Sequence, residues 1–438
     1  MRAMQIFISF LIFIPLVSHA QEKETEQKAP PVEESQTNLI SWSIGVQFGS
    51  LSINGVNYNA IRFQPDISIW KFGIGLDLNF EFTADGYFRK TEWDSWQAVI
   101  SKILYLRFGF KKEPIYVKIG GINDFIFGDG FIVNRYSNML NYPAVKKLGF
   151  CLDLDFNFAG FESMADNVFD WDILGLRGYA RPLITTDMPI FSKLEIGATV
   201  AADLDPKNPH PSADKPYDFT DSTNSTNSVF IYGADISLPL VEASIFNMKT
   251  YADFAGIANK GTGEAIGISG NIGPAEIIFP YRLELRVFQP KFAPSYFNTY
   301  YDAERAYKYE SLDFLTNNYI GWLFSSGINL FENKIVWLIQ LEGAFSGDSK
   351  PSMIMTFSLT KDLFKMIAFK FTWMRQNIKD FNDIFYLETA NSIFLLDVDF
   401  FASDNLVIAL NYKRTFEVDS SGEIHPFSST SISTKILF

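Results

Sequence analysis

The chain alternates apolar and polar residues with a period of two over long stretches. Positions 71 to 82 read Lys-Phe-Gly-Ile-Gly-Leu-Asp-Leu-Asn-Phe-Glu-Phe, with a large apolar residue at every even position and glycine or a polar residue at every odd position. Successive side chains of a β-strand point to opposite faces of the sheet, so this strand has one apolar face and one wet face. A helix of period 3.6 would not separate these residues into two faces.

The same alternation returns along most of the chain and predicts a series of strands. Several segments of about ten residues present one entirely apolar face. Lipid outside and water inside a closed barrel explain this more simply than a soluble sandwich does. We therefore expect an all-β fold, a transmembrane antiparallel β-barrel of up-and-down topology. The predicted strands span 40–49, 58–69, 71–83, 99–110, 115–121, 148–159, 171–181, 193–204, 229–239, 241–253, 264–272, 275–289, 319–331, 334–345, 352–361, 365–375, 392–401, 405–416 and 428–438.

The number of predicted strands is odd, whereas bacterial single-chain barrels have an even number. Counting forward from the first strand places the connections 84–98 and 122–147 outside the cell. The forward and backward counts disagree between about 111 and 192, so we place the error there. We expect about 18 strands, within a range of 16–20, and a barrel of that width leaves a lumen. Counting back from the C-terminus places outside the long connections 205–228, 290–318, 376–391 and 417–427.

The segment 122–147 is too apolar for a solvated loop, although it contains a Gly-Asp-Gly turn and positive charges. One interpretation is an inward-folded constriction or plug that narrows the pore. The other is an additional hairpin around the Gly-Asp-Gly turn, which would repair the odd strand count. The sequence supports the two equally. The candidate constriction residues are Asp129, Arg135, Tyr136 and Tyr142.

A second irregular segment, 291–318, is rich in tyrosine. One interpretation is that it covers the mouth of the barrel or binds sugars or a host surface. The other, which we favour, is that its aromatic side chains pack on one another.

The N-terminal region carries signals of its own. Residues 1–20 combine a basic start, an apolar run too short to span a bilayer and small residues before a cleavage site near Ala20, which predicts a signal peptide. Residues 21–38 are charged, contain two consecutive prolines and lack aromatic residues, which predicts a disordered acidic linker. Residues 39–438 are expected to form one barrel.

Composition limits the partners and the covalent chemistry. The net charge of −13 disfavours nucleic acid as a partner. The single cysteine, Cys151, excludes an internal disulfide framework. Its parity with Asp153 and Asp155 predicts that the thiol lies on the wet face.

Nothing in the sequence indicates an enzyme. His19 lies in the signal peptide, and His210 and His425 lie in predicted loops, so no predicted strand carries a histidine base. The P-loop, HExxH, CxxC and dinucleotide-binding motifs are all missing. We expect no catalytic residue, no bound metal and no cofactor.

Charged residues share the wet face of many predicted strands. Carboxylates pair on three strands, and such pairs form either a cation-attracting wall or a calcium site. We favour solvated lumen charges, which keep the channel wet and the strands facing correctly. A net acidic lumen should pass cations better than anions. The charged residues predicted to face the lumen are Asp77, Glu81, Arg107, Lys118, Asp153, Asp155, Arg282, Glu284, Arg286, Lys370, Asp397 and Asp399.

The last predicted strand ends in Phe438, with apolar Ile436 and Ile432 at alternate preceding positions and a mild departure at Thr434. With the signal peptide and the alternating strands, this ending resembles Gram-negative outer-membrane β-barrels of the porin-like class, without the motif of a particular family. The resemblance implies a bacterial outer-membrane location, contact with outer-membrane lipid, and recognition of Phe438 by the barrel-insertion machinery.

These features predict a channel for diffusion or weakly selective uptake of small hydrophilic solutes through a water-filled lumen. Two alternatives remain: a plugged or gated transporter for hydrophobic or larger substrates, and a surface adhesion or structural protein. The pattern of residues carries no signature of the solute or of the oligomeric state.

Overall fold

The computed structural model describes residues 40–53, 56–142, 145–207, 227–345, 350–380, 382–385, 392–418 and 423–437. The predicted signal peptide 1–20, the predicted linker 21–38 and Phe438 lie outside the described residues, so these three predictions remain untested.

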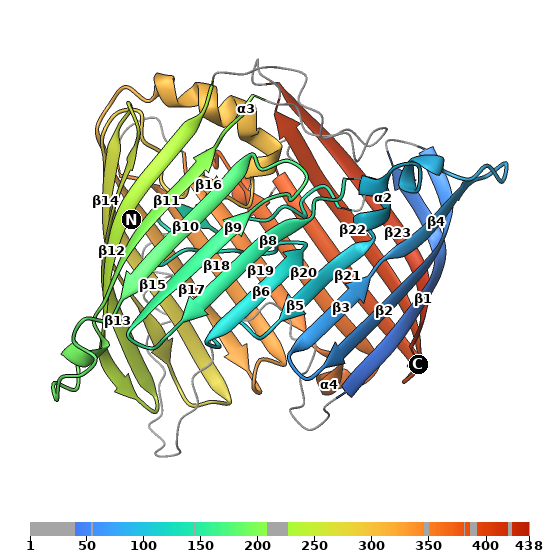
Figure 1. Ribbon diagram of the computed structural model, residues 1–438, viewed down its shortest axis with the longest axis horizontal. Helices are drawn as coiled ribbons and strands as arrows, with labels where there is room; N and C mark the ends of the chain where they lie inside the picture. The colour runs from blue at the N-terminus through green and yellow to red at the C-terminus, as the bar shows by residue number, and fades with distance from the viewer. Residues whose placement is uncertain are drawn as a thin grey trace.

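The alternating segments form one closed antiparallel sheet, in which the last strand pairs back with the first (Figure 1). Its strands are β1 (Ile40–Ile53), β2 (Val56–Ile69), β3 (Phe72–Leu76), β4 (Leu78–Thr83), β5 (Ile103–Phe108), β6 (Ile115–Gly120), β8 (Gly149–Asp155), β9 (Ala159–Ala165), β10 (Ile173–Ala180), β11 (Glu195–Asp203), β12 (Val229–Ala243), β13 (Phe246–Ile257), β14 (Thr262–Ile272), β15 (Ile277–Phe288), β17 (Tyr319–Leu330), β18 (Ile335–Ala344), β19 (Ser352–Leu359), β20 (Ile367–Arg375), β21 (Ser392–Ser403), β22 (Leu406–Val418) and β23 (Ile424–Leu437).

The predicted value of about 18 strands is two too low, and the observed number lies at the upper end of the predicted range of 16–20. The sheet has 21 strands within the described residues, but β3 and β4 both pair with β2 and are two halves of one strand, so 20 strands surround the lumen. The strand missing from the prediction is β9, which lies in the region where the two counts disagree. Phe161 is the one large apolar residue on its outer face, where Ser163 also lies, so its alternation is too weak to detect.

The connections divide between the two rims of the barrel: 84–98 lies on the rim that the forward count predicted, and 290–318 on the rim that the count from the C-terminus predicted. One rim, the outer rim, carries the connections that contain α2 (Trp96–Ile100) and α3 (Tyr301–Ser311) (Figure 1). The opposite rim carries short turns, α4 (Lys361–Phe364) and one longer connection, 181–194, which contains the 3-10 helix Phe191–Lys193.

The outer face of the ring is apolar. Large apolar side chains from successive strands remain exposed there, among them Phe63, Leu176, Ile266 and Ile408. Because a soluble sheet would bury such a face, a closed barrel with this exterior faces lipid. Among the described residues, no helix is long and apolar enough to cross a membrane.

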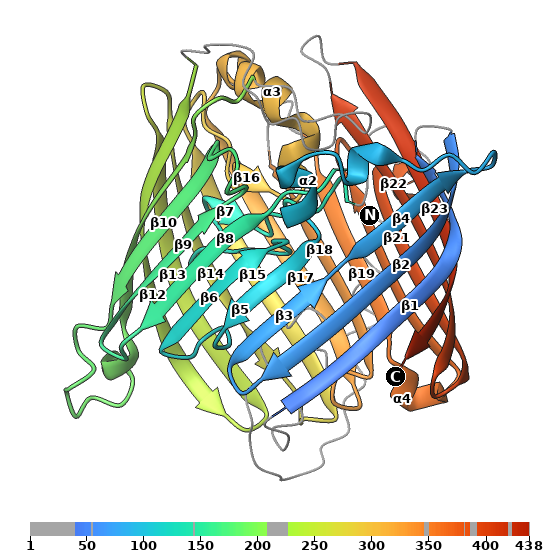
Figure 2. The same cartoon turned by 45° about the vertical axis from the view of Figure 1, so that its right-hand side comes forward.

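Two connections from the outer rim fold into the barrel. One comprises the described residues of 121–148 and the other residues 289–318; together we call them the inner unit. A short parallel pairing of β7 (Val133–Asn134) with β16 (Phe297–Asn298) joins them. Figure 2 shows both strands within the ring, and Figure 1 shows β16 there.

Candidate functional site

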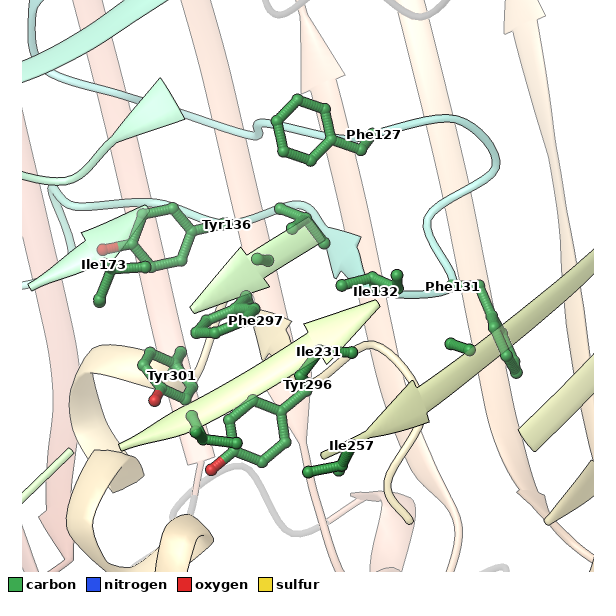
Figure 3. Close-up of a cluster of buried hydrophobic side chains, with 14 of the residues drawn as sticks. Phe127, Phe131, Ile132, Tyr136, Ile173, Ile231, Ile257, Tyr296, Phe297 and Tyr301 are labelled. Atoms are coloured by element: carbon green, nitrogen blue, oxygen red, sulfur yellow. The ribbon is translucent and has the colours of Figure 1, made fainter. Parts of the chain in front are cut away.

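Aromatic side chains from both segments of the inner unit form its core (Figure 3). Tyr296 packs edge-on against Phe297 with ring centroids 5.2 Å apart, and Phe131 and Phe292 are 5.7 Å apart. Such pairs stabilise beyond the area they bury. Further members of this core are Phe125, Phe127, Ile132, Tyr136 and Tyr301.

This core decides between the interpretations of the two irregular segments. No described residue of 122–147 pairs within the barrel sheet, so the additional transmembrane hairpin is wrong and the inward-folded arrangement is correct. The favoured interpretation of 291–318, aromatic packing, is confirmed. The partner aromatics include those of the other segment, because the two fold together inside the barrel.

Glycines on the inner wall make room for this core. A Cβ atom at Gly175 of β10 would lie 2.5 Å from Cε2 of Phe127, and one at Gly233 of β12 would lie 2.8 Å from Cδ1 of Ile132. The wall is therefore shaped to the inner unit. Cys151 lies on the inner face of β8, as its parity predicted, but this core covers it and leaves it 4% exposed, so the face is not wet at this position.

Replacing Gly175 by valine should lift the inner unit away from the wall. Overpacking of this kind costs about 1–3 kcal/mol, which raises the population of displaced states on the order of 10- to 100-fold. We expect the Cys151 thiol to react with a maleimide faster by a similar factor. The matched control is Gly178→Val on the same strand, where an added Cβ meets nothing within 4 Å. If Cys151 reacts with the maleimide at the same rate in both variants, the inner unit does not pack against Gly175 as described.

The inner unit is anchored to the wall by a buried polar cluster at the break between β3 and β4, which we call the root cluster. Asp77 lies at this break and its side chain is fully buried. It is 2.9 Å from Nε of Arg62 and accepts a hydrogen bond from the Tyr142 hydroxyl. The Lys146 ammonium donates to Oδ1 of Asn79 at 2.9 Å. The other members are Glu81, Arg89, Glu92 and Lys102.

Charge compensation in the root cluster is strong. Burial opposes ionisation of Glu92, but Lys146 and Lys102 nevertheless hold its pKa down to about 2. Burial, together with repulsion from Lys146, lowers the pKa of Lys102 to about 8. Asp77 and Glu81 were predicted to be solvated lumen charges, and that prediction is wrong because both are buried in this cluster.

A second buried group, the α3 anchor, ties the helix to the wall. Arg305 of α3 donates to Asp203 at 2.5 Å and to Asp172 at 2.9 Å. The Tyr301 hydroxyl donates to the same Asp203 carboxylate at 2.6 Å. Every one of these contacts joins residues about a hundred or more positions apart, so the anchor holds the helix across the fold.

A neighbouring ion pair links the two segments of the inner unit. The Lys147 ammonium lies 2.9 Å from Asp302 and 3.3 Å from Asp166. The Tyr136 hydroxyl donates to Asp302 at 3.2 Å. Burial raises the pKa of Asp166 to about 7, although Lys147 opposes this shift.

Two of the four candidate constriction residues, Asp129 and Tyr142, bind the wall, and the other two make contacts within the inner unit. Asp129 at the tip forms an ion pair with Lys249 of β13 at 2.5 Å, and its carbonyl accepts a hydrogen bond from Arg282. Arg135 pairs with Asp124 within the same segment at 2.5 Å. Tyr136 and Tyr142 bind the buried carboxylates described above. All four residues therefore belong to the inner unit, but each has a different binding partner.

The register places the predicted lumen charges on the inner face of the sheet, where some lie beside opposite charges and others beside like charges. Asp155 pairs with Arg181 at 2.9 Å, and Asp399 pairs with Lys435 at 2.8 Å. Lys370 faces Asp397 on the next strand. The remaining ones lie in rows along the wall: Glu284 beside Arg282 and Arg286, Arg107 opposite Lys118, and Asp153 opposite Glu162. Asp153, Glu284 and Arg286 are buried, so the prediction of solvated charges is wrong for these three as well.

Several functional residues escaped the sequence analysis, namely Glu92, Lys102, Lys146, Lys147 and Arg305. All lie in connections, where strand parity gives no orientation. The adjacent lysines in an apolar segment were the one available signal. In the described part of the chain, no group of three or more His, Cys, Asp or Glu residues is arranged to hold a metal ion.

Comparisons with known proteins add little to this geometry. No protein-family model and no curated protein matches the chain. Among solved structures, the siderophore receptor PirA from Acinetobacter baumannii is 9% identical with a TM-score of 0.38, and the match covers 92% of this chain and 81% of that one. Pseudomonas aeruginosa OpdK with vanillate is 8% identical with a TM-score of 0.36, over 91% of this chain and 98% of that one.

Likenesses this weak carry no argument, so the class of protein rests on the chain's own architecture. The sheet closes on itself, its outer face is apolar, and its inner face is polar. These properties make the chain a porin-like β-barrel of the bacterial outer membrane.

Proposed function

We propose that the protein is an outer-membrane channel for diffusion or weakly selective uptake of small hydrophilic solutes. The observation that carries this proposal is the inner wall on β20 to β23. Several polar side chains there keep partial or full exposure inside the ring, although Thr372, Thr415 and Ser433 on the same strands are buried. A polar, hydrated wall is what a path for polar solutes requires. The polar residues of this wall that remain partly or fully exposed include Lys370, Asp397, Asn411 and Lys435.

The charges along this wall favour weak selection. Lys435 and Asp399 neutralise one another, and Lys370 lies opposite Asp397. Because the chain carries a net charge of −13, we propose that the balance still favours cations.

The test is single-channel recording of refolded residues 21–438 in a planar bilayer. We expect steady open steps and a reversal potential in a salt gradient that favours K⁺ over Cl⁻. Lys370→Gln should increase the preference for K⁺ because it removes a positive charge from the wall. Lys260→Gln, at an exposed ion pair with Asp313 in the outer-rim connections, serves as the control. A preference for anions would contradict the assignment of the lumen charges.

A gated transporter for larger or hydrophobic substrates is the second candidate. The specific observation for it is that the inner unit contacts well-separated parts of the wall. Lys413 of β22 donates to the carbonyl of Tyr142 at 2.9 Å, while the tip binds Lys249 of β13. A folded but silent barrel that conducts only as Gly175→Val would favour this candidate over the open channel.

The third hypothesis, a surface adhesion protein, rested mainly on the aromatic residues of 291–318. Most aromatic residues of 291–318 that suggested a binding surface are buried in the inner unit, as with Tyr296 and Tyr300. Phe314 and Tyr307 remain exposed on this segment.

A further inference from the structure

One carboxylate in the lumen has no partner of opposite charge. Asp253 of β13 faces inward between Asp235 of β12 and Ala265 of β14, and it is 9% exposed. Among the described residues, no hydrogen bond or ion pair reaches its carboxylate. A buried carboxylate in this condition is costly unless something neutralises it.

The surroundings of Asp253 increase this cost. The negative charges of Asp129, Glu284 and Asp235 act on it, against the single positive charge of Arg282. Like charges directly opposite on neighbouring strands, as Asp253 and Asp235 are, destabilise a sheet.

The nearby bases are already bound by the other three carboxylates. Lys249 pairs with Asp129 at 2.5 Å, and Arg177 pairs with Asp235 at 2.7 Å. The third carboxylate, Glu284, lies 2.6 Å from Arg286 and also contacts Arg282. Of the four carboxylates, Asp253 is therefore the one that forms no ion pair with a side chain of the wall. It also keeps some contact with the lumen.

We propose that Asp253 alone binds a small monovalent cation from the lumen, beside Asp235 on the neighbouring strand and within the field of Asp129. A monovalent ion suits the site because one negative charge is uncompensated. Alkali ions and primary ammonium groups share the required chemistry. Because Asp129 is the tip of the inner unit, an ion at this position also stabilises the seating of that tip against β13.

This inference deepens the proposed channel and rests on it only for the access of ions. Its test is equilibrium unfolding, which needs no conduction, so the two proposals can fail separately. Thermal unfolding of refolded 21–438 in detergent is measured while K⁺ replaces a bulky quaternary ammonium ion at constant ionic strength. Binding to the folded state should raise the unfolding temperature by about 2–4 °C.

Asp253→Asn should abolish this dependence on K⁺, since it removes the uncompensated charge while keeping the shape of the side chain. Asp397→Asn, an exposed lumen position on β21, should keep the dependence. Repeating the measurement with methylammonium in place of K⁺ shows whether the site binds alkali ions alone or primary ammonium groups as well. Either result supports the proposal.

Two results would overturn it. An identical response to K⁺ in Asp253→Asn would show that the ion binds elsewhere. A wild-type protein that ignores K⁺ but loses stability as the pH rises, with the loss removed by Asp253→Asn, would show that a proton neutralises the carboxyl group.

Discussion

Replacing Arg305 by methionine should release the inner unit from the wall while the ring of strands remains. Arg305 is 5% exposed, and Asp203, to which it donates, is fully buried. Methionine keeps much of the length of the side chain but leaves a buried carboxylate without its cation. Breaking a buried ion pair in this way costs about 3–5 kcal/mol. We expect the Cys151 thiol to react with a maleimide on the order of a hundredfold faster or more.

Two companion variants separate charge from packing. Asp203→Asn combined with Arg305→Met removes the stranded charge and should recover part of the loss. Lys291→Met breaks an exposed ion pair with Asp313 in the same segment and should cost less than about 1 kcal/mol. Labelling of Arg305→Met at the rate of Lys291→Met would show that the α3 anchor does not hold the inner unit.

The ring of strands could be predicted from the sequence because each strand carries its own signal. Lipid requires an apolar outer face and the lumen tolerates polar residues, so parity alone orients most side chains. β9 escaped because small residues and Ser163 stand where the outer face is elsewhere apolar. Its omission lowered the strand count by one. Comparing the count from the N-terminus with the count from the C-terminus located the error between about 111 and 192 but did not identify the missing strand.

The inner unit could not be predicted to the same depth, because its contacts join distant positions without a period. Phe131 meets Phe292, and Tyr136 meets Asp302, each across more than 150 residues. Composition showed that both segments are too apolar or aromatic for open loops. It did not show that they pack on each other, or that glycines such as Gly175 and Gly233 receive them.

Parity also cannot separate a charge in water from one in a buried network. Asp77 and Asp397 were predicted as equivalent lumen carboxylates, and both lie on the inner face. Asp77 is fully buried among Arg62, Lys146 and Tyr142, whereas Asp397 is exposed and accepts one hydrogen bond from Asn411. The difference arises from the connection 84–102 and from the inner unit, which cover the first position and not the second.

The same substitution should therefore cost much more stability at Asp77 than at Asp397. Asp77→Asn leaves the buried cations Arg62 and Lys146 short of a counter-charge, and we expect a loss of about 3–5 kcal/mol from the seating of the inner unit. Asp397→Asn should change stability by no more than about 0.5 kcal/mol. Denaturant unfolding and maleimide labelling of Cys151 measure both.

Adding Lys146→Met to Asp77→Asn tests whether charge balance is the cause. With Lys146 removed, the root cluster retains fewer unmatched cations, so the double variant should be more stable than Asp77→Asn alone. If the two substitutions simply add, the cost comes from lost hydrogen bonds at each position. If Asp77→Asn behaves like Asp397→Asn, the root cluster contributes nothing to holding the inner unit. Asp77 also lies at the break between β3 and β4, where its backbone amide donates a 2.7 Å hydrogen bond to the carbonyl of Lys102. In that case the backbone hydrogen bond, and not the Asp77 side chain, would hold the wall together at the break.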